Sequence, residues 1–270
     1  MGAARLRAVL DAGGIRPRKE LGQNFVVDPN TIRKVVDAAQ LAPKDRVLEI
    51  GAGGGSLTLG LDAAAQWVVA VELDARLLPV IEDVLADTTN VEILHADALR
   101  MSLGDLEVNR LVANLPYGIA APVVIRVLSE APQVGELTVM TQREVGRRFA
   151  SLPGSRVYGT TSVLVRYFGE ASVVANVSRN AFYPVPNVDS VVVRIVRHAR
   201  EPVVARADFF AVVKAAFSQR RKMLRNTLSA HAGSAQDAER ALADCGIDPR
   251  ARAESLDVAD FVRLTQELHR

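Results

Sequence analysis

Asn114-Leu115-Pro116-Tyr117 is the stretch of this sequence with the most specific chemistry. Such a turn could activate an exocyclic amine, for example that of adenine. This amine is a poor nucleophile because its lone pair is delocalised into the ring. Acceptors aimed at its two hydrogens would return that lone pair to the nitrogen. The side-chain oxygen of Asn114 can be one acceptor, and the backbone carbonyl of Leu115 can be the other. Pro116 stiffens the turn, and Tyr117 offers a flat face for the base, so the tetrapeptide predicts catalysis by position and electrostatics.

A second aromatic motif, Phe-Tyr-Pro-Val-Pro-Asn-Val-Asp-Ser, runs from Phe182 to Ser190. Its prolines favour an extended loop that presents Phe182 or Tyr183 at a fixed angle. An aromatic ring opposite Tyr117 would sandwich an extruded base, and such stacking contributes about 1–3 kcal/mol per base. The alternative is that Phe182 fills core space at the edge of a sheet.

A glycine-rich loop, Gly-Ala-Gly-Gly-Gly at residues 51–55, follows a predicted strand and precedes a predicted helix. Glycine adopts positive φ readily and lets a ligand approach the backbone closely. The dinucleotide fingerprint would need glycine at position 56, which is Ser56, and the lysine of a P-loop is absent. The glycine spacing at 51, 53 and 55 instead matches the G-x-G-x-G loop of methyltransferases.

Two acids follow the next two predicted strands, Glu72 and Asp97. Glu72 can accept hydrogen bonds from both ribose hydroxyls of an adenosine-type cofactor, and Asp97 can accept one from an adenine amino group. With Gly51 and Asn114 they fall at the carboxyl ends of predicted parallel strands, which is where ligands bind in open α/β sheets. The ordered series predicts an S-adenosylmethionine site, in which the sulfonium provides the leaving group.

Strand-like and helical segments alternate from residue 28 to about residue 200. The predicted strands are 46–50, 67–71, 91–95, 110–113, 136–141, 171–177 and 190–196, and the predicted helices are 29–39, 57–65, 75–85, 123–129 and 144–150, whereas 161–168 fits either. Asp28 and Pro29 mark the start of the first helix. The alternation predicts a mostly parallel sheet with helices on both faces, and the last two strands could form an antiparallel edge.

The pattern changes near residue 200. Residues 200–205, which contain Glu201-Pro202, indicate a linker, and only helices are predicted after it, at 208–229, 235–243 and 258–268. Asp257 and Asp260 have the spacing of a capping box at the last of these. We therefore predict a catalytic domain at 1–200, with 1–28 as its lead-in, and a small helical domain at 201–270.

Composition indicates a folded protein that neither spans a membrane nor carries internal disulfides. Of 270 residues, 49% are hydrophobic and 24% are charged, which argues for a folded chain, and no apolar run approaches a membrane span. Arg5 and Arg7 precede no long apolar segment, so a secretory signal is not expected. The single cysteine, Cys245, excludes an internal disulfide and favours a reducing, cytoplasmic setting. His95 and His198 lack partners at metal-ligand spacing, so neither metal nor covalent catalysis is expected.

Basic residues gather in three groups although the net charge is only +2. The groups are Arg16, Arg18 and Lys19; Arg143, Arg147 and Arg148; and Arg220, Arg221, Lys222 and Arg225. Each group alone can be an ordinary solvated face. Three of them in a nearly neutral chain favour a polyanionic partner.

Together these motifs resemble the small-subunit ribosomal RNA adenine dimethyltransferase family (KsgA type), over nearly the whole chain. Leu-Gly-Gln-Asn-Phe at 21–25 is similar to the N-terminal signature of the family, and Phe-Ser-Gln-Arg-Arg-Lys at 217–222 is similar to the start of its C-terminal domain. One departure is in the glycine loop, where Ala52 and Gly54 stand at positions at which the family often has Pro and Leu.

The resemblance implies a Rossmann-like class I methyltransferase sheet and the following site residues. Contacts to S-adenosylmethionine would come from Asn24, Val26, Gly51, Glu72, Asp97 and Asn114, and the target adenine would lie among Asn114, Leu115, Tyr117 and Phe182. The implied reaction is dimethylation of two adjacent adenines in a hairpin loop near the 3′ end of small-subunit ribosomal RNA. The implied partner is that RNA or a precursor of the small subunit, bound by a monomer, with no membrane partner and a role in ribosome biogenesis.

Two alternatives remain open. One is the related large-subunit adenine methylase that confers macrolide resistance, although the Phe182 loop and residues 217–222 look more like the small-subunit enzymes. The other is a ribosome-assembly or RNA-binding factor in which methylation is secondary or lost. The intact tetrapeptide from Asn114 to Tyr117 argues against loss.

Overall fold

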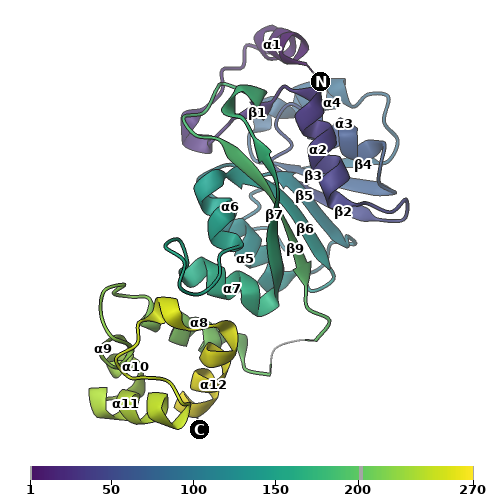
Figure 1. Cartoon of the computed structure of the whole chain (residues 1–270). Helices are drawn as coiled ribbons and strands as arrows, with labels where there is room; N and C mark the ends of the chain where they lie inside the picture. The colour runs from purple at the N-terminus through teal and green to yellow at the C-terminus, as the bar shows by residue number, and fades with distance from the viewer. Residues whose placement is uncertain (1, 201–202, 270) are drawn as a thin grey trace. The chain divides into compact units, whose positions relative to one another are not determined.

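A computed structural model describes residues 2–200 and 203–269 of the chain, which divide into two compact units (Figure 1). The first unit holds residues 2–147 and 171–197. The second unit holds residues 148–170 and the described residues from 198 onward. Within the described residues, no helix is long and apolar enough to cross a membrane.

The main sheet has seven strands in the order β4-β3-β2-β5-β6-β9-β7. Their bounds are β2 Arg46–Ile50, β3 Trp67–Glu72, β4 Val91–His95, β5 Arg110–Asn114, β6 Glu136–Gln142, β7 Gly169–Val177 and β9 Ser190–Arg197. Strands β4 to β6 run parallel, and β9 is antiparallel to β6. The predicted α/β class is therefore confirmed. The chain runs outward from β2 to β4 and returns to β5 on the other side of β2, which makes a topological switch point between β2 and β5.

Helices and two short strands complete the first unit. They are α1 Ala3–Ala12, α2 Pro29–Ala39, α3 Ser56–Asp62, α4 Leu78–Val84, α5 Ala120–Glu130 and α6 Arg143–Phe149, the 3₁₀ turns Lys19–Leu21, Ala75–Leu77 and Arg179–Ala181, and the paired strands β1 Phe25–Val26 and β8 Phe182–Tyr183. Asp28 caps α2 as predicted, because its carboxylate accepts hydrogen bonds from the backbone N–H groups of Asn30 and Thr31. Helix α1 was not foreseen; it buries Leu6 and Leu10 against the core.

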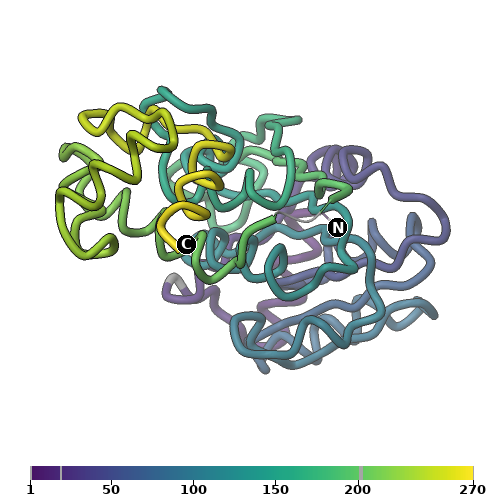
Figure 2. Tube along the Cα trace, turned by 90° about the horizontal axis from the view of Figure 1, so that it is seen from below, coloured from purple at the N-terminus to yellow at the C-terminus, as the bar shows by residue number. Residues whose placement is uncertain are grey.

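The second unit is helical, as predicted, and its helices after residue 203 form the green-to-yellow part of Figure 2. The helices of the whole unit are α7 Thr160–Phe168, α8 Arg206–Ala216, α9 Leu224–Thr227, α10 Ser229–Ala232, α11 Ala235–Asp244 and α12 Val258–Leu268, with a 3₁₀ turn at Ala253–Ser255. The capping box of α12 is confirmed by reciprocal bonds between Asp257 and Asp260. The single helix predicted at 208–229 is wrong. The chain leaves the helix after Ala216 and resumes at Leu224, whose N–H donates to the carbonyl of Ala251 at 2.8 Å.

The division of the chain differs from the predicted one. Residues 148–170 pack with the C-terminal helices, because the Tyr158 hydroxyl donates to the carbonyl of Leu256 and the ring of Tyr167 stacks on Phe209 with centroids 4.2 Å apart. The chain passes from the first unit into the second again between residues 197 and 198, close to the domain boundary predicted after residue 200. Glu201 and Pro202 of the predicted linker lie outside the described residues.

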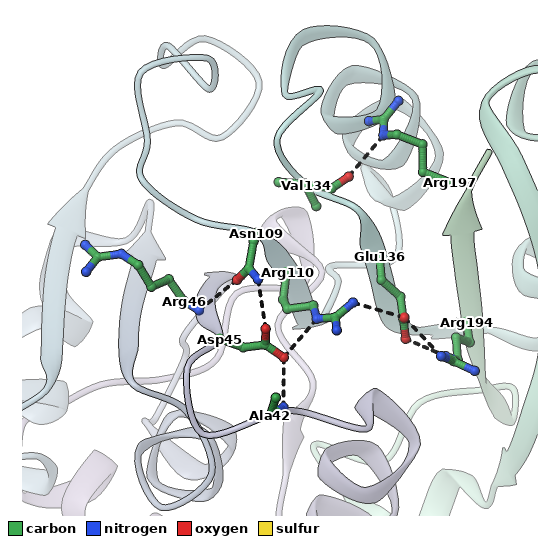
Figure 3. A network of polar contacts seen from close by, with 9 residues as sticks. All are labelled: Ala42, Asp45, Arg46, Asn109, Arg110, Val134, Glu136, Arg194 and Arg197. Carbon is green, nitrogen blue, oxygen red and sulfur yellow. Dashed lines mark hydrogen bonds and ion pairs between the residues drawn. The ribbon is translucent and has the colours of Figure 1, made fainter. Parts of the chain in front are cut away.

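A polar network joins the starts of the central strands, at the edge opposite their carboxyl ends (Figure 3). Arg110 contacts two buried acids, Asp45 through Nε and Glu136 through Nη1, both at 3.0 Å. Arg194 donates to the same Glu136 from β9. Asn109 donates to Asp45 and accepts from the N–H of Arg46. These contacts connect β2, β5, β6 and β9, so they hold the strands in register.

Removal of Glu136 is expected to destabilise this edge. In Glu136→Ala, Arg110 and Arg194 lose their shared partner, and the free energy of unfolding should fall by about 2–3 kcal/mol. The loss is smaller than for a fully buried pair because both guanidinium groups are partly exposed to water. Urea unfolding at neutral pH measures this loss. Glu107→Ala is the matched control, since Glu107 forms an exposed pair with Arg46 and its loss should cost under about 1 kcal/mol. Equal effects of both substitutions would contradict the assignment.

Candidate active site

A cavity lies at the carboxyl ends of β2, β3, β4 and β5, at the switch point of the sheet. Residues 20–25 form part of its wall, together with the turns that follow the four strands. Seven of the predicted site residues line it: Asn24, Gly51, Glu72, Asp97, Asn114, Leu115 and Tyr117. Val26 and Phe182 are not among the lining residues. The sheet topology therefore brings together residues that are separated by more than 90 positions in the sequence.

The glycine loop needs its glycines for two physical reasons. Gly51, Gly53 and Gly55 have positive φ values of 82°, 60° and 75°. A Cβ atom at Gly51 would lie 3.3 Å from Cδ of Pro116, and one at Gly53 would lie 2.9 Å from Cδ1 of Phe25. The loop can therefore approach the Asn114 turn and the N-terminal segment only because these side chains are missing.

Glu72 supports the glycine loop and also lines the cavity. Its Oε2 accepts a hydrogen bond from the N–H of Gly53 and its Oε1 accepts one from the N–H of Asp74, both at 2.8 Å. Burial raises the pKa of Glu72, although these backbone hydrogen bonds act in the opposite direction. Each oxygen keeps a further lone pair, so the carboxylate can still accept from a ligand hydroxyl.

Asp97 follows β4 and is more exposed than Glu72. Its Oδ1 accepts a hydrogen bond from the N–H of Leu99 at 2.9 Å, and its Oδ2 lies 3.4 Å from Nε of Arg100. The side chain is held at the wall of the cavity, where its remaining acceptor capacity matches an amino group.

Asn114 is held so that its oxygen serves as an acceptor. Its Nδ2 donates to the backbone carbonyl of Asn24 at 3.1 Å, which assigns the other end of the amide as Oδ1. That Oδ1 is buried and has no hydrogen-bond partner within the described residues. The N–H of Leu115 donates to the carbonyl of Met140 and fixes the turn against β6. The site therefore presents a preformed acceptor in a turn that is anchored on both sides.

Tyr117 lines the same cavity, and its hydroxyl is hydrogen-bonded to Oγ of Ser190 at 2.8 Å. Burial raises the pKa of the Tyr117 phenol, so the group stays protonated at neutral pH. Sequence reasoning did not single out Ser190 as part of the site, because nothing local relates position 190 to position 117.

Phe182 lies inside the protein core, with 2% of its surface exposed, beside Val26, Ile32 and Val192. It pairs with Val26 across the two-residue strands β1 and β8. The sequence allowed Phe182 either to stack on a base opposite Tyr117 or to fill core space at the edge of a sheet. The structure shows the second arrangement. A stacking role for Phe182 would require its ring to become accessible, and it stays a prediction. Val26 lines a second, smaller pocket, together with Asn114 and residues of the glycine loop.

Gln23 holds residues 20–25 at the wall of the cavity. Its Nε2 donates to Oδ2 of Asp74 at 2.9 Å, and its Oε1 accepts from the N–H of Arg18 at 2.7 Å. The Arg76 guanidinium, together with Gln23, holds the pKa of Asp74 well below its usual range, so this acceptor is charged. The Gln23–Asp74 contact therefore joins the N-terminal segment to the chain just after Glu72.

Comparison with known proteins identifies the family. Residues 14–270 match the family model described as ribosomal RNA adenine dimethylase. The chain belongs to this family. A relative from Thermobifida fusca is 47% identical over 94% of this chain and 91% of its own length, and one from Acidothermus cellulolyticus is 44% identical over 98% and 94%. Both are named ribosomal RNA small subunit methyltransferase A.

Two solved structures share the adenine dimethylase fold. A dimethyladenosine transferase from Plasmodium falciparum has a TM-score of 0.78 at 24% identity, over 89% of this chain and 95% of the other. The 23S rRNA methyltransferase ErmE has a TM-score of 0.71 at 30% identity, over 92% of this chain and all of the other. The likeness to the dimethyladenosine transferase supports the predicted α/β fold. Family membership confirms the predicted methyltransferase class and S-adenosylmethionine as the cofactor.

The cavity of this adenine dimethylase fits its cofactor. The glycine loop leaves its backbone open at positions where a Cβ atom would collide, and Asn114 offers a buried acceptor that has no partner in the described part of the chain. No group of three or more His, Cys, Asp or Glu side chains able to hold a metal occurs in the described part of the chain. The donors and acceptors of the cavity thus suit an adenosine with an amino acid tail.

Loss of the Gln23 contact is expected to weaken cofactor binding. In Gln23→Ala, the segment 20–25 loses its hydrogen bond to a charged acceptor, and the Kd for S-adenosylmethionine should rise about tenfold. Titration calorimetry measures the Kd, and the melting temperature without cofactor should fall by no more than a few degrees. Gln66→Ala, at an exposed position outside the cavity, is the control. An unchanged Kd in Gln23→Ala would refute this role of the segment.

Proposed function

We propose that this enzyme transfers methyl groups to N6 of two adjacent adenosines in a hairpin loop near the 3′ end of small-subunit ribosomal RNA. The relatives named small subunit methyltransferase A, at 44–47% identity over nearly the full length, support this substrate. The observation that carries the chemistry is the buried, unpartnered Oδ1 of Asn114, whose amide is held by Asn24. It is a fixed acceptor at the switch point of the sheet.

S-adenosylmethionine, when bound, supplies a methyl group on a positively charged sulfur that is a good leaving group. We assign its binding to Asn24, Val26, Gly51, Glu72, Asp97 and Asn114. Glu72 and Asp97 would accept from the ribose and the adenine amino group, while the glycines give the ligand access to the backbone.

The residues around the target base act by position. Asn114 Oδ1 accepts from one N–H of the amine and the Leu115 carbonyl accepts from the other, which concentrates the lone pair on nitrogen. Tyr117 supplies a face for stacking. An unpaired loop suits this site, because a base outside a duplex costs less to extrude.

We assign RNA contact to the helical unit. Two of its basic residues, Arg220 and Arg225, are paired with Glu254 and Glu239, whereas Arg221 and Lys222 are exposed between them in sequence. Exposed cations on one short segment suit a phosphate backbone. The natural partner would be a precursor small subunit in the cytoplasm, bound by a monomer during ribosome biogenesis.

The Asn114→Ala variant tests the central role. Removal of one preorganised acceptor should lower methyl transfer by about 100-fold or more, while the cofactor Kd should rise less than tenfold. The assay is transfer of tritiated methyl groups to small subunits from a strain lacking the enzyme, with mapping of the modified base. Asn180→Ala, at an exposed site outside the cavity, should keep full activity. Full turnover by Asn114→Ala would refute the assignment.

Wild-type enzyme in the same assay discriminates between substrates. The structural likeness to the 23S rRNA methyltransferase ErmE makes large-subunit RNA the competing substrate. Label on the small subunit alone, in two adjacent adenines, is the expected result. Label on bare large-subunit RNA alone would overturn the proposal, and binding without any label would favour an assembly factor.

RNA affinity is expected to depend on salt through the exposed cations. The logarithm of the binding constant should fall linearly with the logarithm of salt concentration, and Arg221→Ala or Lys222→Ala should each reduce that slope by about one. Filter binding at several salt concentrations measures the slopes. Lys44→Ala, which changes an exposed lysine of the first unit, is the control. Slopes identical to wild type in both variants would place the RNA contacts elsewhere.

A further inference from the structure

Ser190 lies at the far end of the Tyr117 ring. It is the first residue of β9, it is fully buried, and its Oγ is 2.8 Å from the Tyr117 hydroxyl. The strand ladder pairs Ser190 with Gln142 of β6, so the backbone that carries the hydroxyl is fixed. We propose that Ser190 is a positioning residue for methyl transfer, because its buried hydroxyl sets the orientation of the Tyr117 ring against the target base. The inference rests on the proposed function.

Tyr117 needs a second anchor because of its place in the chain. It follows Pro116 in the turn after β5, and Gly118, which restricts the backbone least, comes next. A ring held only through its Cβ can still rotate about its side-chain bonds. A hydrogen bond at the hydroxyl fixes the end of the ring that is most distant from the backbone. The face offered to a base is then defined before the base arrives, which is the condition for catalysis by position.

Asp189 holds Ser190 in place from the neighbouring position. Its backbone carbonyl accepts from the N–H of Arg143 at 3.0 Å, and its carboxylate accepts from the N–H of Arg179 at 3.2 Å. The carboxylate also forms an ion pair with the Arg143 side chain at 3.3 Å. These contacts join the loop before β9 to the start of α6, so Ser190 has a rigid base.

Helix α6 packs closely on the start of β9. A Cβ atom at Gly146 would lie 2.3 Å from Cγ2 of Val191, the residue after Ser190. The helix therefore lies as near to the strand as a glycine permits. The residue next to Ser190 is thus packed tightly against α6, which limits how far the Ser190 hydroxyl can move relative to Tyr117.

A purely structural serine and a positioning serine predict different outcomes. A hydroxyl that only satisfies a buried polar group would affect stability and leave the ring of Tyr117 in place. A hydroxyl that orients the ring would affect turnover through Tyr117 and through no other residue. The contact can be broken from either side, by Ser190→Ala or by Tyr117→Phe, which keeps the ring and removes its hydroxyl.

A double-substitution cycle measures the coupling. Ser190→Ala and Tyr117→Phe should each lower kcat about fivefold to twentyfold, and the double variant should be no slower than the slower single variant, because one contact is lost in all three. The Kd for S-adenosylmethionine should stay at the wild-type value. Ser102→Ala, an exposed serine outside the cavity, is the control and should keep wild-type turnover. Losses that multiply in the double variant, or full activity of Ser190→Ala, would overturn the proposal.

A readout independent of activity separates this inference from the proposed function. The chain has four tyrosines, so ring-labelled protein gives few NMR signals, and the Tyr117 signal is assigned by its absence in Tyr117→Ala. In Ser190→Ala that signal should shift and sharpen as the ring gains freedom, while those of the other three tyrosines stay in place. An unchanged Tyr117 signal would overturn the positioning role. If wild-type enzyme labels no adenine in either subunit, the proposed function fails whatever the NMR result.

Discussion

The turn after β2 and the turn after β5 share one narrow space, and a glycine at position 51 lets them do so. A side chain at Gly51 would come within 3.3 Å of Pro116, in the middle of the Asn114 turn. The two turns belong to strands that are adjacent in the sheet and more than 60 residues apart in the chain. Because they touch, a cofactor on the glycine loop and a base beside Tyr117 can share one cavity. Glu72 and Phe25 depend on the same loop, one by hydrogen bonding to Gly53 and one by packing on it.

The buried oxygen of Asn114 limits which chemical groups fit the site. An unpaired buried acceptor costs about 1–3 kcal/mol, so Asn114 Oδ1 favours any ligand that brings an N–H group to it. A base with a keto oxygen at the equivalent position would place two acceptors against each other and leave both unsatisfied. Nδ2 of Asn114 cannot turn to correct this mismatch without giving up its bond to Asn24. The amide orientation therefore suits an amino group, as the proposed role of Asn114 toward the target adenine requires.

Local sequence patterns predicted the site residues at strand ends. The features that the sequence did not predict depend on contacts between residues far apart in the chain. Gly51 and Asp97 come just after β2 and β4, and Glu72 and Asn114 are the last residues of β3 and β5. Parallel pairing brings these four residues to one edge, so the sequence sufficed to collect them. After the break at Ala216 the chain bonds through Leu224 to Ala251, and the buried Phe182 pairs with Val26. Neither partner is near in sequence. Residues 148–170 joined the helical unit for the same reason, through Tyr158 and Tyr167.

The two edges of the sheet carry opposite kinds of polar group. At the strand starts, Asp45 and Glu136 are buried but fully engaged by arginine and asparagine. At the carboxyl ends, Asn114 Oδ1 and one oxygen of Glu49 are buried without hydrogen-bond partners among residues 2–200 and 203–269, and burial raises the pKa of Glu49 to about 8. Such groups destabilise a fold, and they persist only where other contacts hold the backbone. The network at the strand starts fixes the register of the strands whose far ends carry the site. Stability at one edge thus permits an unsatisfied acceptor, Asn114 Oδ1, at the other, where a ligand can use it.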